Sequence, residues 1–293
     1  MSSVSSSDEL AIGDLIEQVE QSTIRLVATA VTLTNADIRG PSVLPGWSRG
    51  QVLLHVARSA DAYTWLLRSA RRSTQLGSRP STTAPPAAAA TAVEVAGDLQ
   101  VSLEQFAAEI GEMPADAWSQ MVTALAGWPH PAWFTLRRCL RELETHHFDL
   151  RCGYRAQDWP TPYVAWALDD TLATMRAQGF PLGSAEATDL GRTWTITPGG
   201  PSVTAAGHEL LGWLAGRSES PGTNADTALP NPPPWPQPPS SMGSTPNFSR
   251  PSRRPASSGR GSQLRIPPLH LPGLDVLLDC DDVDCSDVGV GGQ

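Results

Sequence analysis

The stretch Arg141–Leu150 reads RELETHHFDL, and its spacing predicts a helix with two different sides. Glu142, His146 and Asp149 fall at i, i+4 and i+7, on one side of the cylinder. A separate apolar stripe runs beside them and consists of Leu136, Leu140, Leu143 and Leu150. The helix can therefore pack on its neighbours and still present a carboxylate and an imidazole to a cleft.

Glu142 and His146 are spaced so that one helix can supply two ligands to a single metal ion. The best candidate for a third ligand is His55, in LLHVAR on an earlier predicted helix. A lone histidine on a helix more often has a structural role, so alternatives stay open. His147 competes with His146, but it lies nearer the apolar stripe, where a core role is expected. Glu144 with His147 is a second possible pair, roughly opposite Glu142.

Apolar residues at helical spacing predict four long helices. These cover about residues 8–34, 49–72 and 92–111, followed by the helix that carries Glu142 and His146. Ser48, with Gln51 three residues later, is a capping-box start for the second helix. Four long helices with one connection of intermediate length, residues 73–91, predict an up-down four-helix bundle over residues 8–155.

A small α/β domain is predicted over residues 160–217. The segment DWPTPYVAWALDDTLATMRA reads as a helix entered through Pro160 and Pro162. RTWTITPGG and PSVTAAG read as two short strands around a turn at Gly199 and Gly200, and HELLGWLAGRS closes with a short helix. Residues 218–293 are rich in Pro, Ser and Gly and are predicted to form a disordered tail. The predicted fold class is mainly α.

Composition limits the function classes. The net charge of −9 argues against a nucleic-acid role resting on a general basic surface. No stretch reaches the length of apolar sequence that a membrane span needs, and MSSVSSSDEL lacks the pattern of a secretory signal. The cysteines show no CxxC spacing: Cys139, Cys152, Cys280 and Cys285. A reduced, cytoplasmic protein is the expectation.

Several motifs, taken in order, resemble one known family. LPGWSRGQVLLHVARSADA, residues 44–62, resembles the N-terminal region of the mycothiol-dependent maleylpyruvate isomerase family, whose bundle is DinB-like. RELETHHFDL resembles the metal-ligand helix of that family. GRTWTI and ELLGWLAGRS look like its small C-terminal domain. The resemblance covers about residues 8–237.

The resemblance implies a zinc ion held by His55, Glu142 and His146, and mycothiol as the thiol cofactor. It also implies that Arg217, in LAGR, is the arginine that handles the substrate. The implied reaction converts maleylpyruvate to fumarylpyruvate. The thiolate adds to the cis double bond, the new single bond rotates, and elimination regenerates the thiol.

The proposed residues suit this chemistry. Three protein ligands leave zinc an open position, as in catalytic sites. An arginine such as Arg217 can meet a developing enolate or hold a carboxylate, although near a helix C-terminus it could instead complement the helix dipole. Asp149 is expected to orient a ligand rather than to bind the metal.

Two other functions stay open. In a mycothiol S-transferase, the activated thiol would attack another electrophile and stay attached. The segment 73–91, which departs from the family pattern, keeps this alternative alive. The third possibility is a non-catalytic metal-binding module. The expected partners are a small-molecule substrate and mycothiol, with no nucleic acid and no membrane. The oligomeric state stays open, and a monomer is compatible with the sequence.

Overall fold

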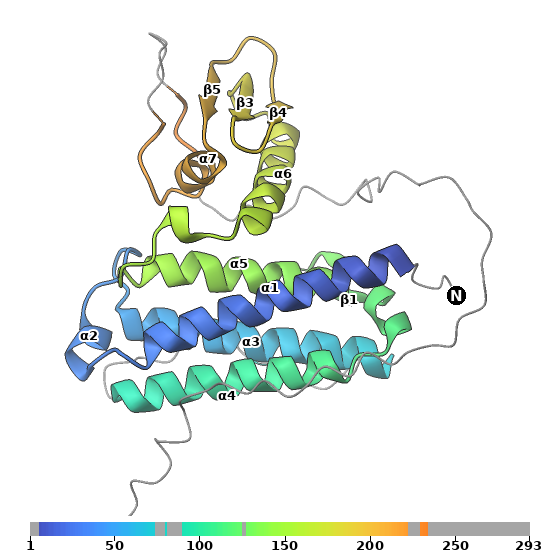
Figure 1. Cartoon of the computed structure of the whole chain (residues 1–293), viewed down its shortest axis with the longest axis vertical. Helices are drawn as coiled ribbons and strands as arrows, with labels where there is room; N and C mark the ends of the chain where they lie inside the picture. The colour runs from blue at the N-terminus through green and yellow to red at the C-terminus, as the bar shows by residue number, and fades with distance from the viewer. Residues whose placement is uncertain (1–5, 74–79, 81–89, 125–126, 222–228, 234–293) are drawn as a thin grey trace, which may run out of the picture.

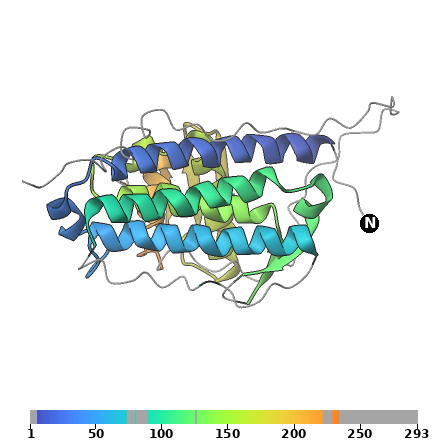
Figure 2. The same ribbon diagram turned by 90° about the horizontal axis from the view of Figure 1, so that it is seen from below.

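Four long helices form the body of the protein (Figure 1). The computed structural model describes residues 6–73, 80, 90–124, 127–221 and 229–233. The helices are α1 (Ser6–Ala30), α3 (Arg49–Arg72), α4 (Ala92–Gly111) and α5 (Phe134–Asp149). Contacts join α1 to α4 and α5, and α3 to α4 and α5, so each helix packs on two others. Figure 2 shows α1, α4 and α3 lying along one another. The predicted four-helix bundle is confirmed.

The capping signals in the sequence explain where these helices begin. Ser48 and Gln51 form the expected capping box, and α3 starts at Arg49 as predicted. Thr91 and Glu94 form an equivalent box at the start of α4. Leucines from all four helices meet in the core, and among those with less than 2% exposure are Leu26, Leu53, Leu67, Leu99 and Leu136. Their burial supplies the main favourable term in folding.

The first predicted helix, residues 8–34, is too long. The α1 helix ends at Ala30, and a separate short helix, α2 (Asn35–Arg39), follows. Thr34 and Asp37 form a capping box that starts this second helix, and the apolar pattern alone did not reveal the break. The guanidinium of Arg49 holds α2 against the end of α5, because it donates to Asp37 O at 3.1 Å and to Leu150 O at 2.6 Å.

Two short elements lead from α4 to α5. A 3₁₀ helix, η2 (Ala115–Ser119), precedes an antiparallel pair of strands, β1 (Met121–Thr123) and β2 (Pro129–Pro131). Trp128, just before β2, and His130, in β2, contact the ring of Phe134 at the start of α5, the first edge to face and the second at a tilt.

After α5, the 3₁₀ helix η3 (Ala156–Asp158) leads into α6 (Thr161–Ala177), a three-stranded sheet and α7 (Gly207–Leu214). Figure 1 shows these elements stacked on one side of the bundle, beyond α5. The strands are β3 (Ser184–Ala187), β4 (Arg192–Thr195) and β5 (Ser202–Ala205), in the order β4-β3-β5. The predicted small strand-containing region is therefore present, while its predicted boundaries, 160–217, stay a prediction.

Both predicted strands are present, as β4 and β5, with a turn at Pro198 and Gly199 between them, but they do not pair with each other. β3 lies between them, antiparallel to β4 and parallel to β5. The sequence of β3, SAEA, lacks the β-branched and aromatic residues that mark strands, so the pattern gave no sign of it. Gly199 adopts a left-handed φ of 80°, and Gly200 packs backbone to backbone against Gly183, the residue before β3.

Three other predictions from the sequence concern residues that the structure describes only in part. Most of segment 73–91 and of the predicted tail 218–293 lies outside the described residues, as do Cys280 and Cys285. Cys139 and Cys152 are free thiols. No helix in the described ranges has the length and apolar character to cross a membrane.

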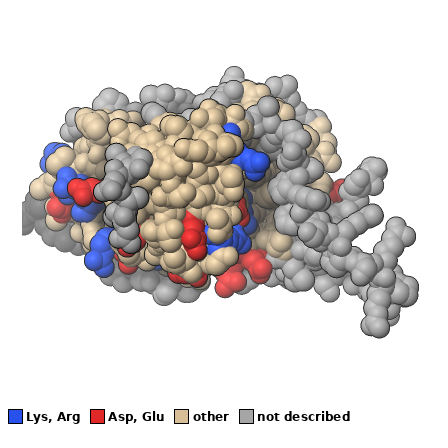
Figure 3. Space-filling view, turned by 90° about the horizontal axis from the view of Figure 1, so that it is seen from above, with Lys and Arg blue, Asp and Glu red and all other residues tan. Residues whose placement is uncertain are grey.

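The face of the molecule that the C-terminal elements form is mostly uncharged (Figure 3). Its acidic and basic side chains lie toward the edges of this face, with the two signs mixed. Described residues on this face therefore gather no single large basic patch.

Glu109 of α4 offers a test of the bundle packing. This carboxylate is buried and pairs with Arg68 Nε at 3.0 Å and Arg71 Nε at 2.6 Å, both on α3. Burial alone would raise the pKa of Glu109, but hydrogen bonds from Arg71 and Arg68 lower it below the ordinary value of 4.5. We expect Glu109→Gln to reduce the unfolding free energy at pH 7 by about 1–2 kcal/mol.

The pH dependence of this loss follows from the lowered pKa. A group with a lowered folded-state pKa stabilises the fold above its unfolded pKa and ceases to do so as pH falls through the folded value. The difference between wild type and Glu109→Gln should be full above about pH 5 and shrink at lower pH. Urea unfolding at several pH values measures it. Glu104→Gln, on the exposed side of α4, is the control, and an equal loss in both variants would contradict the prediction.

Candidate metal centre

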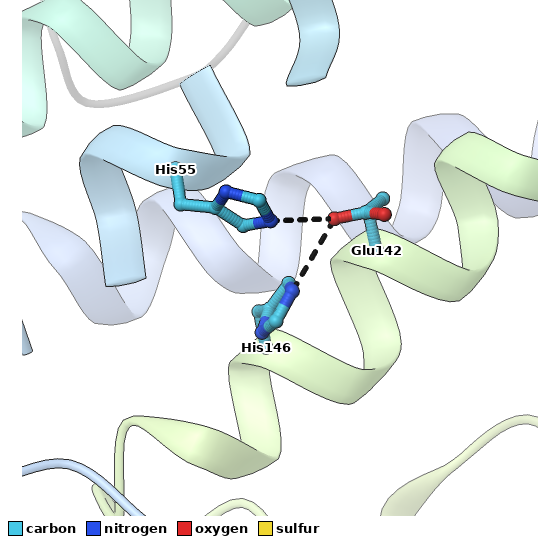
Figure 4. Close-up of side chains that lie close together, drawn as sticks. All are labelled: His55, Glu142 and His146. Carbon is cyan, nitrogen blue, oxygen red and sulfur yellow. Dashed lines mark ion pairs between the residues drawn. The ribbon is translucent and has the colours of Figure 1, made fainter. Parts of the chain in front are cut away.

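Two histidines and one carboxylate converge between α3 and α5 (Figure 4). The Oε2 atom of Glu142 lies 3.3 Å from Nε2 of His55 and 3.3 Å from Nε2 of His146. The three candidate ligand atoms all lie within 4.8 Å of one another. The two imidazole rings meet edge to face, with centroids 5.0 Å apart. The structure thus brings together the three residues that the sequence singled out.

Helical geometry explains this convergence. Glu142 and His146 are one turn apart on α5, and His55 faces them from the second turn of α3. The side chains are partly open to solvent, with exposures of 25% for His55, 22% for Glu142 and 13% for His146. A group of this exposure can be reached by a small molecule, unlike the core residues beside it.

The Glu142 carboxylate also meets two hydroxyl groups that sequence reasoning did not assign to the site. Tyr63 Oη lies 3.3 Å from Oε1, and Ser59 Oγ lies 3.4 Å from Oε2. Burial alone would raise the pKa of Glu142, but hydrogen bonds from His146 and His55 lower it well below its usual value. Spacing offered a signal, because His55, Ser59 and Tyr63 are four residues apart and share one face of α3.

His146 is held in place from behind by Asp149. Its Nδ1 donates to Asp149 Oδ2 at 2.9 Å, which leaves Nε2 directed at the other two candidate ligands. Burial would lower the pKa of His146, but hydrogen bonds with Asp149 and Glu142 raise it to about 9. The expectation that Asp149 orients a ligand agrees with this contact.

Arg217 reaches the same carboxylate from the segment after α7. Its Nε donates to Asp149 Oδ1 at 3.1 Å and its second terminal nitrogen donates to Oδ2 at 2.8 Å. Arg217 also donates to Ala215 O at 2.7 Å. Sequence reasoning expected Arg217 at the substrate, whereas the structure shows it bound to Asp149, behind His146. Its predicted catalytic role stays a prediction.

The competing pair, Glu144 and His147, lies on the side of α5 that faces α1. Glu144 is 1% exposed and accepts hydrogen bonds from Ser22, Arg25 and Tyr154. His147 Nε2 lies 2.8 Å from Thr29 Oγ1, and its ring stacks on Tyr154 with centroids 3.8 Å apart. Burial and then the charge of Arg25 lower the pKa of His147 to about 4. These contacts agree with the core role expected for His147.

The chemistry of the donor set fits a divalent metal ion. Two imidazole nitrogens and one carboxylate oxygen are ligands that zinc takes in catalytic sites, with further coordination left open. The Asp149 hydrogen bond fixes the His146 tautomer that offers Nε2 to a metal. Among the described residues, no other group of three His, Cys, Asp or Glu side chains could hold a metal ion in this way.

The fold and the site together define a helical bundle with a candidate metal centre between two of its helices. Residues 19–151, which make up most of the bundle, match the family model of the mycothiol maleylpyruvate isomerase N-terminal domain. The resemblance found in the sequence is thereby confirmed.

Solved structures show the same fold. The crystal structure of a mycothiol-dependent maleylpyruvate isomerase superposes with a TM-score of 0.68 at 22% identity, over 76% of this chain and 97% of that one. The crystal structure of a histidine-to-alanine mutant described by the same enzyme name gives 0.68 at 21% identity over the same shares. No curated protein matches the chain.

Zinc binding tests the candidate site directly. We expect the full-length protein to bind one zinc ion, and His55→Ala, Glu142→Gln and His146→Ala each to weaken binding by more than about 100-fold. In other metal sites, loss of a group that only orients a ligand already weakens metal binding by about 10–100-fold. Competition with a chromogenic chelator measures the affinities.

The matched control is His208→Ala, because His208 lies on α7 and its Nε2 is 2.9 Å from Trp159 O. It should bind zinc like the wild type. Equal zinc affinity in the control and the three site variants would contradict the assignment of these ligands.

Proposed function

We propose that the protein is a zinc- and mycothiol-dependent isomerase that converts maleylpyruvate to fumarylpyruvate. One observation carries the proposal: His55, Glu142 and His146 converge in a bundle of the mycothiol maleylpyruvate isomerase N-terminal domain family. The reaction would be a cis–trans isomerisation through reversible addition of a thiol. The thiol is regenerated at the end, so it acts as a cofactor.

In this proposal the three residues would hold the metal ion. A bound zinc ion favours the thiolate form of a nearby thiol, which is the nucleophilic form, at neutral pH. Tyr63 and Ser59 hold the Glu142 carboxylate, and Asp149 holds His146, so these ligands keep their direction before a substrate arrives. Such preorganisation reduces the cost of reaching the reactive geometry.

Arg217 acts in this proposal through Asp149. The guanidinium contacts both oxygens of that carboxylate, and the carboxylate contacts His146. A two-point contact of this kind fixes the carboxylate plane. We therefore infer that Arg217 is a positioning residue. In this proposal it orients Asp149 and does not contact the substrate.

The first test is isomerisation by the purified, zinc-loaded protein. We expect loss of the cis isomer of maleylpyruvate only when mycothiol is present. Absorbance and product analysis measure this loss. His55→Ala should lower kcat/KM by at least about 100-fold, since it removes a proposed metal ligand. Zinc loading is measured on the same samples.

Two outcomes would contradict the proposal. Zinc binding without thiol-dependent turnover of maleylpyruvate would overturn the isomerase assignment. If mycothiol then became attached to other electrophiles, the protein would be an S-transferase. If no electrophile reacted, the non-catalytic metal-binding module would be the better account.

A double-mutant cycle tests the role of Arg217. If Arg217 acts through Asp149, Arg217→Gln should reduce kcat/KM in the wild type but have little further effect in Asp149→Asn. Both single variants should also weaken zinc binding by about 10-fold or more, because both disturb His146. If the effects on kcat/KM multiplied and zinc affinity were unchanged, Arg217 would contact the substrate instead.

A further inference from the structure

A row of polar side chains continues from the candidate metal centre along the contact between α3 and α5. On α3, His55, Ser59 and Tyr63 are spaced four residues apart, and on α5 the matching row is His146, Glu142 and Arg138. Residues at i and i+4 on one helix have Cβ atoms about 5–6 Å apart. Arg138 is therefore one helical turn beyond Glu142, on the same side of α5.

Tyr63 joins Arg138 to the site. Its hydroxyl contacts the Glu142 carboxylate at 3.3 Å, while the guanidinium carbon of Arg138 lies 5.0 Å from the centre of its ring. Trp128 lies on another side, with its ring centre 5.2 Å from the same carbon. The two aromatic rings therefore frame the guanidinium, and cation–π contacts of this kind limit its motion.

His130 contacts the Arg138 guanidinium from a third side. Its Nδ1 is 2.9 Å from Pro131 O and donates to it, so its Nε2 is the acceptor that faces an Arg138 terminal nitrogen at 3.4 Å. His130 is 0% exposed, whereas Arg138 is half-buried. The guanidinium is thus held by neutral groups and still meets solvent.

Arg138 differs from Arg141 and Arg217, the other two arginines of this region that make polar contacts, in lacking an acidic partner. Arg141 pairs with Asp170 at 2.6 Å, and Arg217 pairs with Asp149 at 2.8 Å. Within the described ranges, no carboxylate lies in ion-pair distance of Arg138. The groups that contact the Arg138 guanidinium directly, His130, Tyr63 and Trp128, are all neutral. Such a half-buried guanidinium favours an anion, because part of its hydration has already been removed.

We propose that Arg138 binds a carboxylate of the substrate beside the metal centre. This inference rests on the proposed function and deepens it by naming the residue that selects an acid over a neutral electrophile. The planar guanidinium can hold a carboxylate through two parallel hydrogen bonds. Since the site also contains Glu142 and Asp149, and the chain has a net charge of −9, an acid needs such a local positive group.

The test uses maleate, a small cis-dicarboxylate, as the probe. Maleate is titrated into the full-length, zinc-loaded protein without thiol, and the affinity is measured by isothermal calorimetry. Arg138→Gln should weaken maleate binding about 10-fold or more and leave zinc affinity unchanged. Arg138→Lys should show a smaller loss, since it keeps the charge but lacks the planar fork.

Arg137→Gln is the matched control. Arg137 is the neighbouring arginine on α5, but its guanidinium lies over Trp166, 5.1 Å from the ring centre. This variant should bind maleate like the wild type. Circular dichroism and thermal unfolding confirm that each variant is folded, and Arg138→Lys carries the test if Arg138→Gln does not fold.

The activity data separate substrate binding from metal loading. With maleylpyruvate and mycothiol, Arg138→Gln should raise KM by about 10-fold with a smaller effect on kcat, while reaction with dimethyl maleate, a neutral diester, should change little. Maleate binding that is equal in Arg138→Gln and the wild type, or absent from the wild type at millimolar concentrations, would overturn the inference. Arg138-dependent maleate binding without turnover of maleylpyruvate would support the inference while contradicting the proposed isomerase.

Discussion

The ion pair between the buried Glu144 of α5 and the half-buried Arg25 of α1 sets the rotation of α5 about its own axis. Glu144 is 1% exposed, lies 2.7 Å from Arg25 and also binds Ser22 and Tyr154. Turning α5 would leave this carboxylate buried without partners, which costs several kcal/mol. With that side of the helix fixed on α1, the opposite side must present Glu142 and His146 to α3. The candidate metal centre therefore depends on a contact made on the other side of the helix.

The C-terminal elements depend on the same helix. Trp159 donates from Nε1 to Glu144 O at 3.0 Å, and Arg217 binds Asp149. The last two turns of α5 thus join α1, α3 and the segment after α7. Because Asp149 also holds His146, a shift of the C-terminal elements would change the position of the His146 ring. Arg217, far along the chain, is thus connected to the candidate ligand His146 through Asp149 without touching it.

The sequence predicted the site better than its surroundings. Four-residue spacing showed that Glu142 and His146 share a side of a helix, and capping residues gave the start of α3 at Arg49. Periodicity does not show which side chain faces another across two helices, so the contacts of Tyr63 with Glu142 and of Arg217 with Asp149 were not predicted. It also missed β3, because SAEA has no strand-forming residues and is held by pairing with β4 and β5.

The most direct test of the central claim is X-ray absorption at the zinc edge of the full-length, zinc-loaded protein. The account predicts one zinc per chain, with two imidazole nitrogens at about 2.0–2.1 Å and further light-atom ligands that include a carboxylate oxygen. His55→Ala should lose one imidazole contribution from the spectrum. A wild-type spectrum without two imidazoles, or one that His55→Ala leaves unchanged, would contradict the claim that α3 and α5 share a metal ion.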